Sequence, residues 1–177
     1  APHFIQAHAA IRPIEKVFIW GRNFEKAERL QNDLSFLDLE IQAVQYLEPV
    51  ISKAAIISCA TMSYEPLIFG KWLLPGQHLD LVGSYKPDMR EADDEAILKS
   101  NIYVDVFEGA TKECGDIVIP LEKGVLKKEA IKGDLFDLCK AKCLGRKTEN
   151  EITFFKSVGH ALEDLAAARL ALKNLGE

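Results

Sequence analysis

The chain has 177 residues, a formal net charge of −5 and 48% apolar residues, enough to bury a sizeable core. Lysine and arginine are scattered and form no basic stripe, which argues against nucleic acid as the main partner. Every apolar run is shorter than the roughly 18 residues that span a bilayer, so we predict no membrane partner either.

The four cysteines predict reduced thiols and no metal site. Cys139 and Cys143 could face the same side of a helix, but neither belongs to a CxxC pair and no histidine lies nearby, which disfavours zinc. Reduced thiols are typical of a cytoplasmic protein, and this is the location that we predict.

The first third of the chain alternates helical and strand patterns. The run at 16–20 is apolar throughout, which predicts a strand buried on both faces of a parallel sheet. The apolar spacing at 24–37 predicts an amphipathic helix. We expect helices at 2–11, 24–37 and 48–52 and strands at 16–20 and 40–44.

The first of these strands ends in Gly21-Arg22-Asn23, as the second strand of a dinucleotide-binding unit does. The first strand and its glycine-rich turn would lie about 20 residues upstream, so we expect this chain to be part of a larger protein. An arginine at this place can neutralise the 2′-phosphate of NADP, whereas an acid there favours NAD. The alternative is that Arg22 is an ordinary exposed loop residue.

The middle of the chain continues this rhythm. We expect strands at 54–59, 79–82 and 102–106 and a helix in the second half of 87–100. The alternation of strands and helices predicts a Rossmann-like, doubly wound α/β fold with a parallel sheet. Beyond Asp116 the pattern loosens, with short helices expected at 122–131 and 134–142, an apolar run at 152–156 and an amphipathic helix at 160–175.

Three segments contain candidate site residues. Residues 58–63 follow a strand and offer small side chains beside which a cofactor can lie, although turns rich in Ser and Thr are common. Residues 76–91 carry a strand into a polar loop, whose charged residues could also cap a helix. Lys156 and Ser157 lie between the last apolar run and the last helix, where the lysine contacts a ligand or is a connector residue.

Taken together, residues 19–23, 58–63, 82–91, 115–117 and 152–168 strongly resemble the ornithine cyclodeaminase/mu-crystallin family, in the same order and spacing. The resemblance implies two domains. A Rossmann-like domain, residues 1–150 without its first strand and glycine-rich turn, would bind the dinucleotide. Residues 151–177 would lead back to a largely absent second domain, which supplies the substrate contacts and a homodimer interface.

The same resemblance implies the chemistry. Cyclodeaminases of the family carry an aspartate where this chain has Tyr85. A phenol with an unperturbed pKa of about 10 is a poor base at pH 7, whereas reduction of a preformed iminium requires no base. Tyr85 therefore favours a reductase of a small cyclic ketimine acid. A true ornithine cyclodeaminase and a non-catalytic, cofactor-bound binding protein remain as alternatives.

The predicted cofactor is NADP(H), with NAD(H) possible, and the predicted partner is a small amino or imino acid. Tyr85 and Lys156 are the predicted catalytic residues. The predicted cofactor-binding residues are Arg22, Asn23, Cys59, Ala60, Thr61, Val82, Gly83, Ser84 and Ser157.

Overall fold

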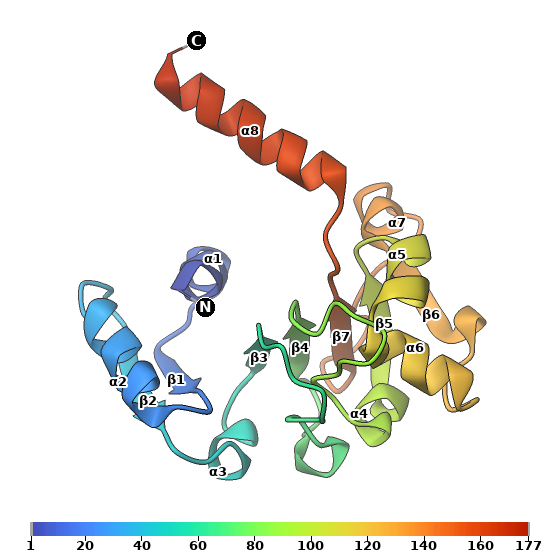
Figure 1. The fold of residues 1–177 in the computed structure, drawn as a ribbon, viewed down its shortest axis with the longest axis horizontal. Helices are drawn as coiled ribbons and strands as arrows, with labels where there is room; N and C mark the ends of the chain where they lie inside the picture. The colour runs from blue at the N-terminus through green and yellow to red at the C-terminus, as the bar shows by residue number, and fades with distance from the viewer. Residues whose placement is uncertain (1, 177) are drawn as a thin grey trace. The chain divides into compact units, whose positions relative to one another are not determined.

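The computed structural model describes residues 2–176, and the chain forms two compact units, Ala1–Ala54 and Ala55–Glu177 (Figure 1). We call them the N-terminal unit and the C-terminal unit. Both contain parallel strands connected through helices, which confirms the predicted α/β class.

The N-terminal unit has a two-stranded parallel sheet in which Lys16 of the first strand lies opposite Glu40 of the second. Ile19, Ala27 and Leu34 form its buried core, with further apolar side chains packed around them. Its elements are α1 (Pro2–Ile11), β1 (Lys16–Trp20), α2 (Phe24–Asp33), β2 (Glu40–Val44) and α3 (Glu48–Ile51).

Two expectations for this unit are wrong in detail. β1 is not buried on both faces, since Ile19 alone among its residues is buried. Within the described residues β1 pairs with β2 on one edge, and this small sheet has too few neighbours to cover both faces. Helix α2 ends at Asp33 rather than at residue 37, because Leu34 leaves helical geometry as the C-cap and a turn follows.

The C-terminal unit contains a five-stranded sheet with the order β3-β4-β7-β5-β6, and all its pairs are parallel. Its elements are β3 (Ile56–Cys59), η1 (Gly70–Trp72), β4 (His78–Leu81), α4 (Asp94–Lys99), β5 (Ser100–Val104), α5 (Phe107–Glu113), α6 (Gly115–Glu122), η2 (Lys128–Ala130), β6 (Ile131–Asp134), α7 (Leu135–Cys139), β7 (Ile152–Lys156) and α8 (Ala161–Leu175).

The apolar run at 152–156 becomes β7, the central strand of this sheet (Figure 1). Phe154 lies opposite Leu79 of β4 on one side and Ile102 of β5 on the other, and all three side chains are buried. A predicted division after residue 150 would therefore separate β7 from the sheet that it completes. The assignment of α8 to a second domain stays a prediction.

The region between β5 and β7 differs most from expectation. The helix predicted at 122–131 is absent, because α6 ends at Glu122 and a turn, η2 and the start of β6 follow. The helix predicted at 134–142 is present as the shorter, five-residue α7, whereas α5, α6 and β6 were not predicted. Extended backbone at Cys114 separates α5 from α6. Residue 115 must be glycine, since a Cβ there would lie 2.1 Å from the carbonyl oxygen of Met89. This close approach packs the start of α6 against the loop that precedes α4.

Helix α8 is the predicted amphipathic helix. His160 caps its start by accepting a hydrogen bond from the Leu162 amide, and Gly176, in left-handed geometry, ends it. None of its residues is buried, and leucines 162, 165, 170, 172 and 175 are exposed. Within residues 2–176, no helix has the length and apolar character needed to cross a membrane.

Candidate functional site

The carboxyl ends of β3 and β4 carry two turns that are hydrogen-bonded to each other. The amides of Val82 and Gly83 donate to the Cys59 carbonyl at 2.9 and 3.3 Å, and the Ser84 amide donates to the Thr61 carbonyl at 2.8 Å. Because parallel strands end at one edge of a sheet, this edge is where α/β proteins bind ligands. The structure thus brings together six predicted site residues: Cys59, Ala60, Thr61, Val82, Gly83 and Ser84.

The side chains in these turns have different environments. Ala60 is exposed and Thr61 is half-buried, so the end of β3 offers accessible main chain beside small side chains. Ser84 is fully buried, has a positive φ of 51° and donates from Oγ to the Ser63 carbonyl at 3.0 Å. The Cys59 thiol is buried, and burial raises its pKa well above the usual value, which keeps it protonated. Cys59 and Ser84 therefore shape the turns from inside.

Gly83 is the point of closest approach between the two turns. A Cβ at this position would lie 2.0 Å from the Thr61 carbonyl oxygen and 2.4 Å from Oε1 of Glu91. No other residue type fits without movement of the main chain. The glycine lets the turn after β4 lie directly on the turn after β3.

A buried group of three charged residues lies behind these turns. The Lys156 ammonium has no solvent exposure, and it lies 3.3 Å from Asp116 Oδ2 and 4.0 Å from Glu91 Oε2. It also donates a hydrogen bond to the Gly83 carbonyl. Glu91 and Asp116 are likewise fully buried. We call Lys156, Glu91 and Asp116 the buried charge cluster.

This geometry bears on the catalytic role predicted for Lys156. Its ammonium contacts the Gly83 carbonyl, Asp116 and Glu91, so Lys156 holds the Gly83 turn and compensates two carboxylates. These are the contacts of a positioning residue. Direct contact with a ligand stays a prediction.

The electrostatics of the cluster are unusual because two carboxylates share one cation. Removal from water is the largest influence on both acids and raises the pKa of Glu91 and of Asp116 above their ordinary values. Lys156 and the surrounding hydrogen bonds act in the opposite direction. The buried charges are therefore compensated by specific contacts and not by solvent.

A third buried carboxylate, Asp105, organises the connection between β7 and α8. Asp105, directly after β5, accepts hydrogen bonds at Oδ2 from Ser157 Oγ at 3.1 Å and from the amides of Val158 and Gly159, each at 2.7 Å. Its Oδ1 accepts from the Val106 amide at 2.7 Å. Ser157, predicted to contact the cofactor, is thus fixed at the same edge, where its amide also donates to the Leu81 carbonyl at 3.0 Å.

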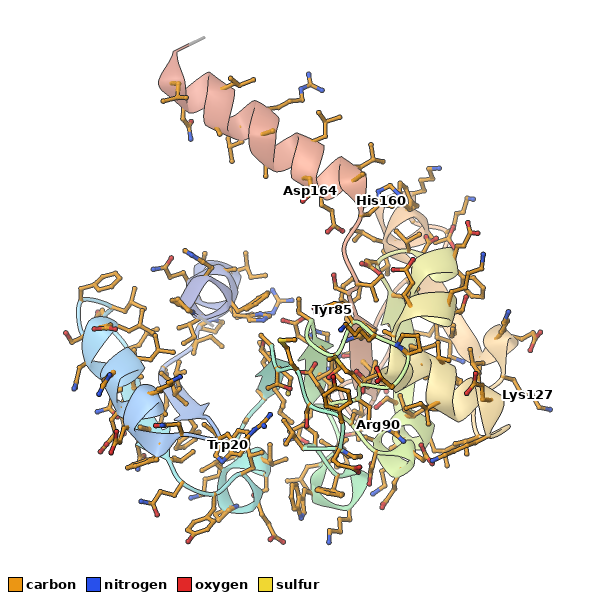
Figure 2. The ribbon with its side chains drawn as sticks, in the orientation of Figure 1. Trp20, Tyr85, Arg90, Lys127, His160 and Asp164 are labelled. Carbon is orange, nitrogen blue, oxygen red and sulfur yellow. The ribbon has the colours of Figure 1, made fainter. Side chains whose placement is uncertain are left out.

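The loop after Ser84 reaches the solvent. Tyr85, the predicted catalytic residue, is 47% exposed, and Figure 2 shows it on the loop that follows β4. The next three residues are exposed as well, whereas Met89 and Arg90 are buried. Arg90 donates to the Ala92 carbonyl at 2.8 Å and pairs with Asp94 at 2.8 Å, so it has a structural role at the start of α4.

In the N-terminal unit, Arg22 and Asn23 follow β1 as predicted. Arg22 is exposed, and among the described residues none forms a hydrogen bond or ion pair with its guanidinium. Asn23 is the N-cap of α2, because its Oδ1 accepts from the Lys26 amide at 3.0 Å. The first turn of α2 therefore begins beside an exposed cation.

The cysteines have no metal-binding arrangement. Helix α7 ends at Cys139, so Cys143 lies beyond the helix and the two cysteines do not share a helix face. All four thiols are free. In the described part of the chain, no group of three or more His, Cys, Asp or Glu side chains is placed to hold a metal ion.

Three functional candidates, Glu91, Asp105 and Asp116, were not predicted from the sequence. We interpreted Glu91 as a helix-start residue and placed Asp105 within a strand. The signal that could have found Asp105 is a lone acid between valines 104 and 106, since a charge in a buried run needs specific partners. Gly115-Asp116 belongs to a segment that carries the family resemblance, but the resemblance gave Asp116 no role of its own.

Known proteins give an independent comparison. The model of the ornithine cyclodeaminase/mu-crystallin family matches residues 1–177. A Delta(1)-pyrroline-2-carboxylate reductase of Paracoccus denitrificans is 37% identical over 169 residues, which cover 95% of this chain and 54% of that protein. The ketimine reductase mu-crystallin of Mus musculus is 34% identical over 158 residues, 88% of this chain and 46% of that protein.

A solved structure agrees with these relatives. The Delta(1)-pyrroline-2-carboxylate reductase of Thermococcus litoralis, in complex with NADH and L-proline, superposes with a TM-score of 0.93 at 35% identity. The match covers 96% of this chain and 53% of that one. The chain thus spans about half the length of the curated relatives it matches. By sequence and by fold, this chain belongs to the ornithine cyclodeaminase/mu-crystallin family.

Proposed function

We propose that the protein containing this chain is an NADPH-dependent reductase of a small cyclic ketimine acid, such as a pyrroline- or piperideine-2-carboxylate. The observation that carries the proposal is the residue type at position 85. An exposed phenol follows the Gly83-Ser84 turn, while the neighbouring carboxylates of Glu91 and Asp116 are buried and ion-paired. The relatives named as pyrroline-2-carboxylate and ketimine reductases support the same reaction class.

The chemistry fits this arrangement of groups. When bound, NADPH supplies a hydride to the iminium carbon of the substrate. Reduction of a protonated cyclic imine requires no protein base, so a phenol at position 85 suffices to orient the substrate. The turns at 60–63 and 82–84, held from behind, present main chain and small side chains against which the redox half of the cofactor would lie.

Selection of the phosphorylated cofactor falls to Arg22. Its exposed guanidinium follows the carboxyl end of β1 and precedes the N-terminus of α2, where main-chain amides favour a negative charge. A guanidinium binds a 2′-phosphate by charge-assisted hydrogen bonds. Asn23 supports this site by fixing the first turn of α2. NAD(H) would bind without this contribution.

The remaining expectations belong to the same proposal. We infer a homodimeric, cytoplasmic protein in which residues outside this chain complete the dinucleotide-binding domain and hold the substrate carboxylate. Helix α8, with no buried residue within the described chain, would pack on that further domain.

A turnover assay on the full-length protein tests the proposal. With NADPH and Delta(1)-pyrroline-2-carboxylate, absorbance of the reduced nicotinamide should fall and proline should accumulate in equal amount. Exposed Asp88 is the nearby carboxylate through which a cyclodeaminase could act. Ammonia release from ornithine, lost in Asp88→Asn, would therefore replace the reductase by the lyase. Tight NADPH binding without turnover of any cyclic imine would indicate a binding protein.

A further inference from the structure

Glu91 joins two turns that the mechanism needs side by side. Its Oε1 accepts hydrogen bonds from the Thr61 amide at 2.6 Å and from the Thr61 hydroxyl at 2.7 Å. Both bonds are short, and the acceptor is fully buried. One carboxylate oxygen therefore holds both polar donors of Thr61, and the turn after β3 cannot move independently of Glu91.

The same carboxylate also limits the turn after β4. The missing side chain of Gly83 leaves room for Glu91 Oε1 and for the Thr61 main chain, each of which would lie within 2.4 Å of a Cβ. Lys156 also donates a hydrogen bond to the Gly83 carbonyl. Thr61, Gly83 and Glu91 are thus in mutual contact. Neither the turn after β3 nor the turn after β4 can shift without a steric clash.

Glu91 is itself held in place by Asp116. Oδ1 of Asp116 accepts from the amides of Glu91 and Ala92 at 2.8 and 3.0 Å, which fixes the main chain that carries the carboxylate. Oδ2 of Asp116 lies 3.3 Å from the Lys156 ammonium. Hydrogen bonds and an ion pair therefore connect Thr61 to Gly83 by way of Glu91, Asp116 and Lys156.

We propose that Glu91 is a positioning residue, which acts through Thr61 and Gly83 to hold the two turns where the redox half of the cofactor lies. This inference rests on the proposed function. Burying two carboxylates with one ammonium is a poor way to gain stability, because desolvation offsets the attraction. A role in placing the main chain of Thr61 and Gly83 explains the buried charge cluster better. Displacement of a reacting group by about 1 Å can lower the rate about 10²-fold.

The test compares Glu91→Ala with Glu91→Gln in the full-length protein. Glutamine keeps an oxygen that accepts both Thr61 bonds, whereas alanine removes it. Glu91→Ala should lower kcat by about 10- to 100-fold with KM for the cyclic imine changed less than threefold. Glu91→Gln should restore kcat to within about threefold of wild type. Asp93→Ala is the matched control: it removes the cap of α4, destabilises the same unit and should leave kcat unchanged.

Hydrogen exchange gives a second measurement that does not depend on catalysis. The Thr61 amide should exchange at least about tenfold faster in Glu91→Ala than in wild type or Glu91→Gln. If Glu91→Ala does not fold, Thr61→Val, which keeps the amide bond and removes the hydroxyl bond, should give a smaller fall in kcat at unchanged KM.

The outcomes separate this inference from the proposed function. A wild type without turnover refutes the reductase, and exchange at Thr61 then still reports on the role of Glu91. A wild type that turns over, with Glu91→Ala equally active or Glu91→Gln as impaired as Glu91→Ala, overturns the positioning role.

Discussion

The two units of the chain place their charges in opposite ways. In the N-terminal unit the charged residue of interest, Arg22, is exposed at the end of a strand, and the core contains apolar side chains alone. In the C-terminal unit Lys156, Glu91, Asp116 and Asp105 are all buried behind the turns that they hold. An exposed charge can recognise a ligand, whereas a buried charge fixes the main chain around it. Mutation of Arg22 should therefore weaken ligand binding, and mutation of the buried charges should lower stability.

The largest effect is expected when the cation of the buried charge cluster is removed. Lys156→Met would leave two buried carboxylates without a counter-charge and should lower the free energy of unfolding by about 3–5 kcal/mol, measured by urea denaturation. Lys123→Met, which removes a half-exposed ion pair with Asp94, should cost at most about 1 kcal/mol. Similar losses in both variants would contradict the distinction between buried and exposed charges.

Removal of the exposed charge should affect binding and leave stability unchanged. Charge-assisted hydrogen bonds contribute roughly 1.5–3 kcal/mol, so Arg22→Ala should weaken NADPH binding by about 10- to 150-fold. NADH, which lacks the 2′-phosphate, should bind with nearly its original affinity. Fluorescence titration of both cofactors measures this, with Arg29→Ala on the exposed side of α2 as control. An equal loss for NADH and NADPH would remove the NADP assignment.

Asp105 is a buried acid that, among residues 2–176, accepts hydrogen bonds but forms no ion pair. Asp105→Ala would leave the amides of Val158 and Gly159 without their acceptor and should cost about 1–3 kcal/mol of stability. The exchange of these two amides should accelerate more than that of the β7 amides. Uniform acceleration throughout the C-terminal unit would instead indicate global destabilisation.

The smallest expected effect is a change with pH in the stability of wild type relative to Glu91→Gln. Burial raises the pKa of Glu91 above its ordinary 4.5, so its contribution to stability is present below that value and is lost as pH rises through the folded-state pKa. The glutamine of the Glu91→Gln variant cannot ionise, and the stability of wild type relative to this variant should therefore fall as pH increases from about 4. A difference that is constant or grows with pH would mean that the Lys156 contact outweighs burial.

The sequence predicts the elements with a clear apolar pattern, such as β1, β2 and α8. It does not predict β6, since Lys132 and Gly133 interrupt its pattern and its partner β5 lies about 30 residues away. The predicted turns do meet at one edge, which follows from parallel strands. Glu91 was missed because an acid after Arg90 is equally typical of a helix start, and long-range contacts alone distinguish the two.

The order in which the chain is synthesised adds a consequence of the place of β7. His78 of β4 pairs with Thr153, 75 residues later, and β7 is the last strand of its sheet to be made. Until residue 156 leaves the ribosome, β4 and β5 have unpaired edges at what becomes the middle of the sheet. Such edges can pair with other chains, and long-range pairing slows folding. The nascent C-terminal unit is therefore most exposed to aggregation just before its final strand emerges, and this is where a chaperone would have the most effect.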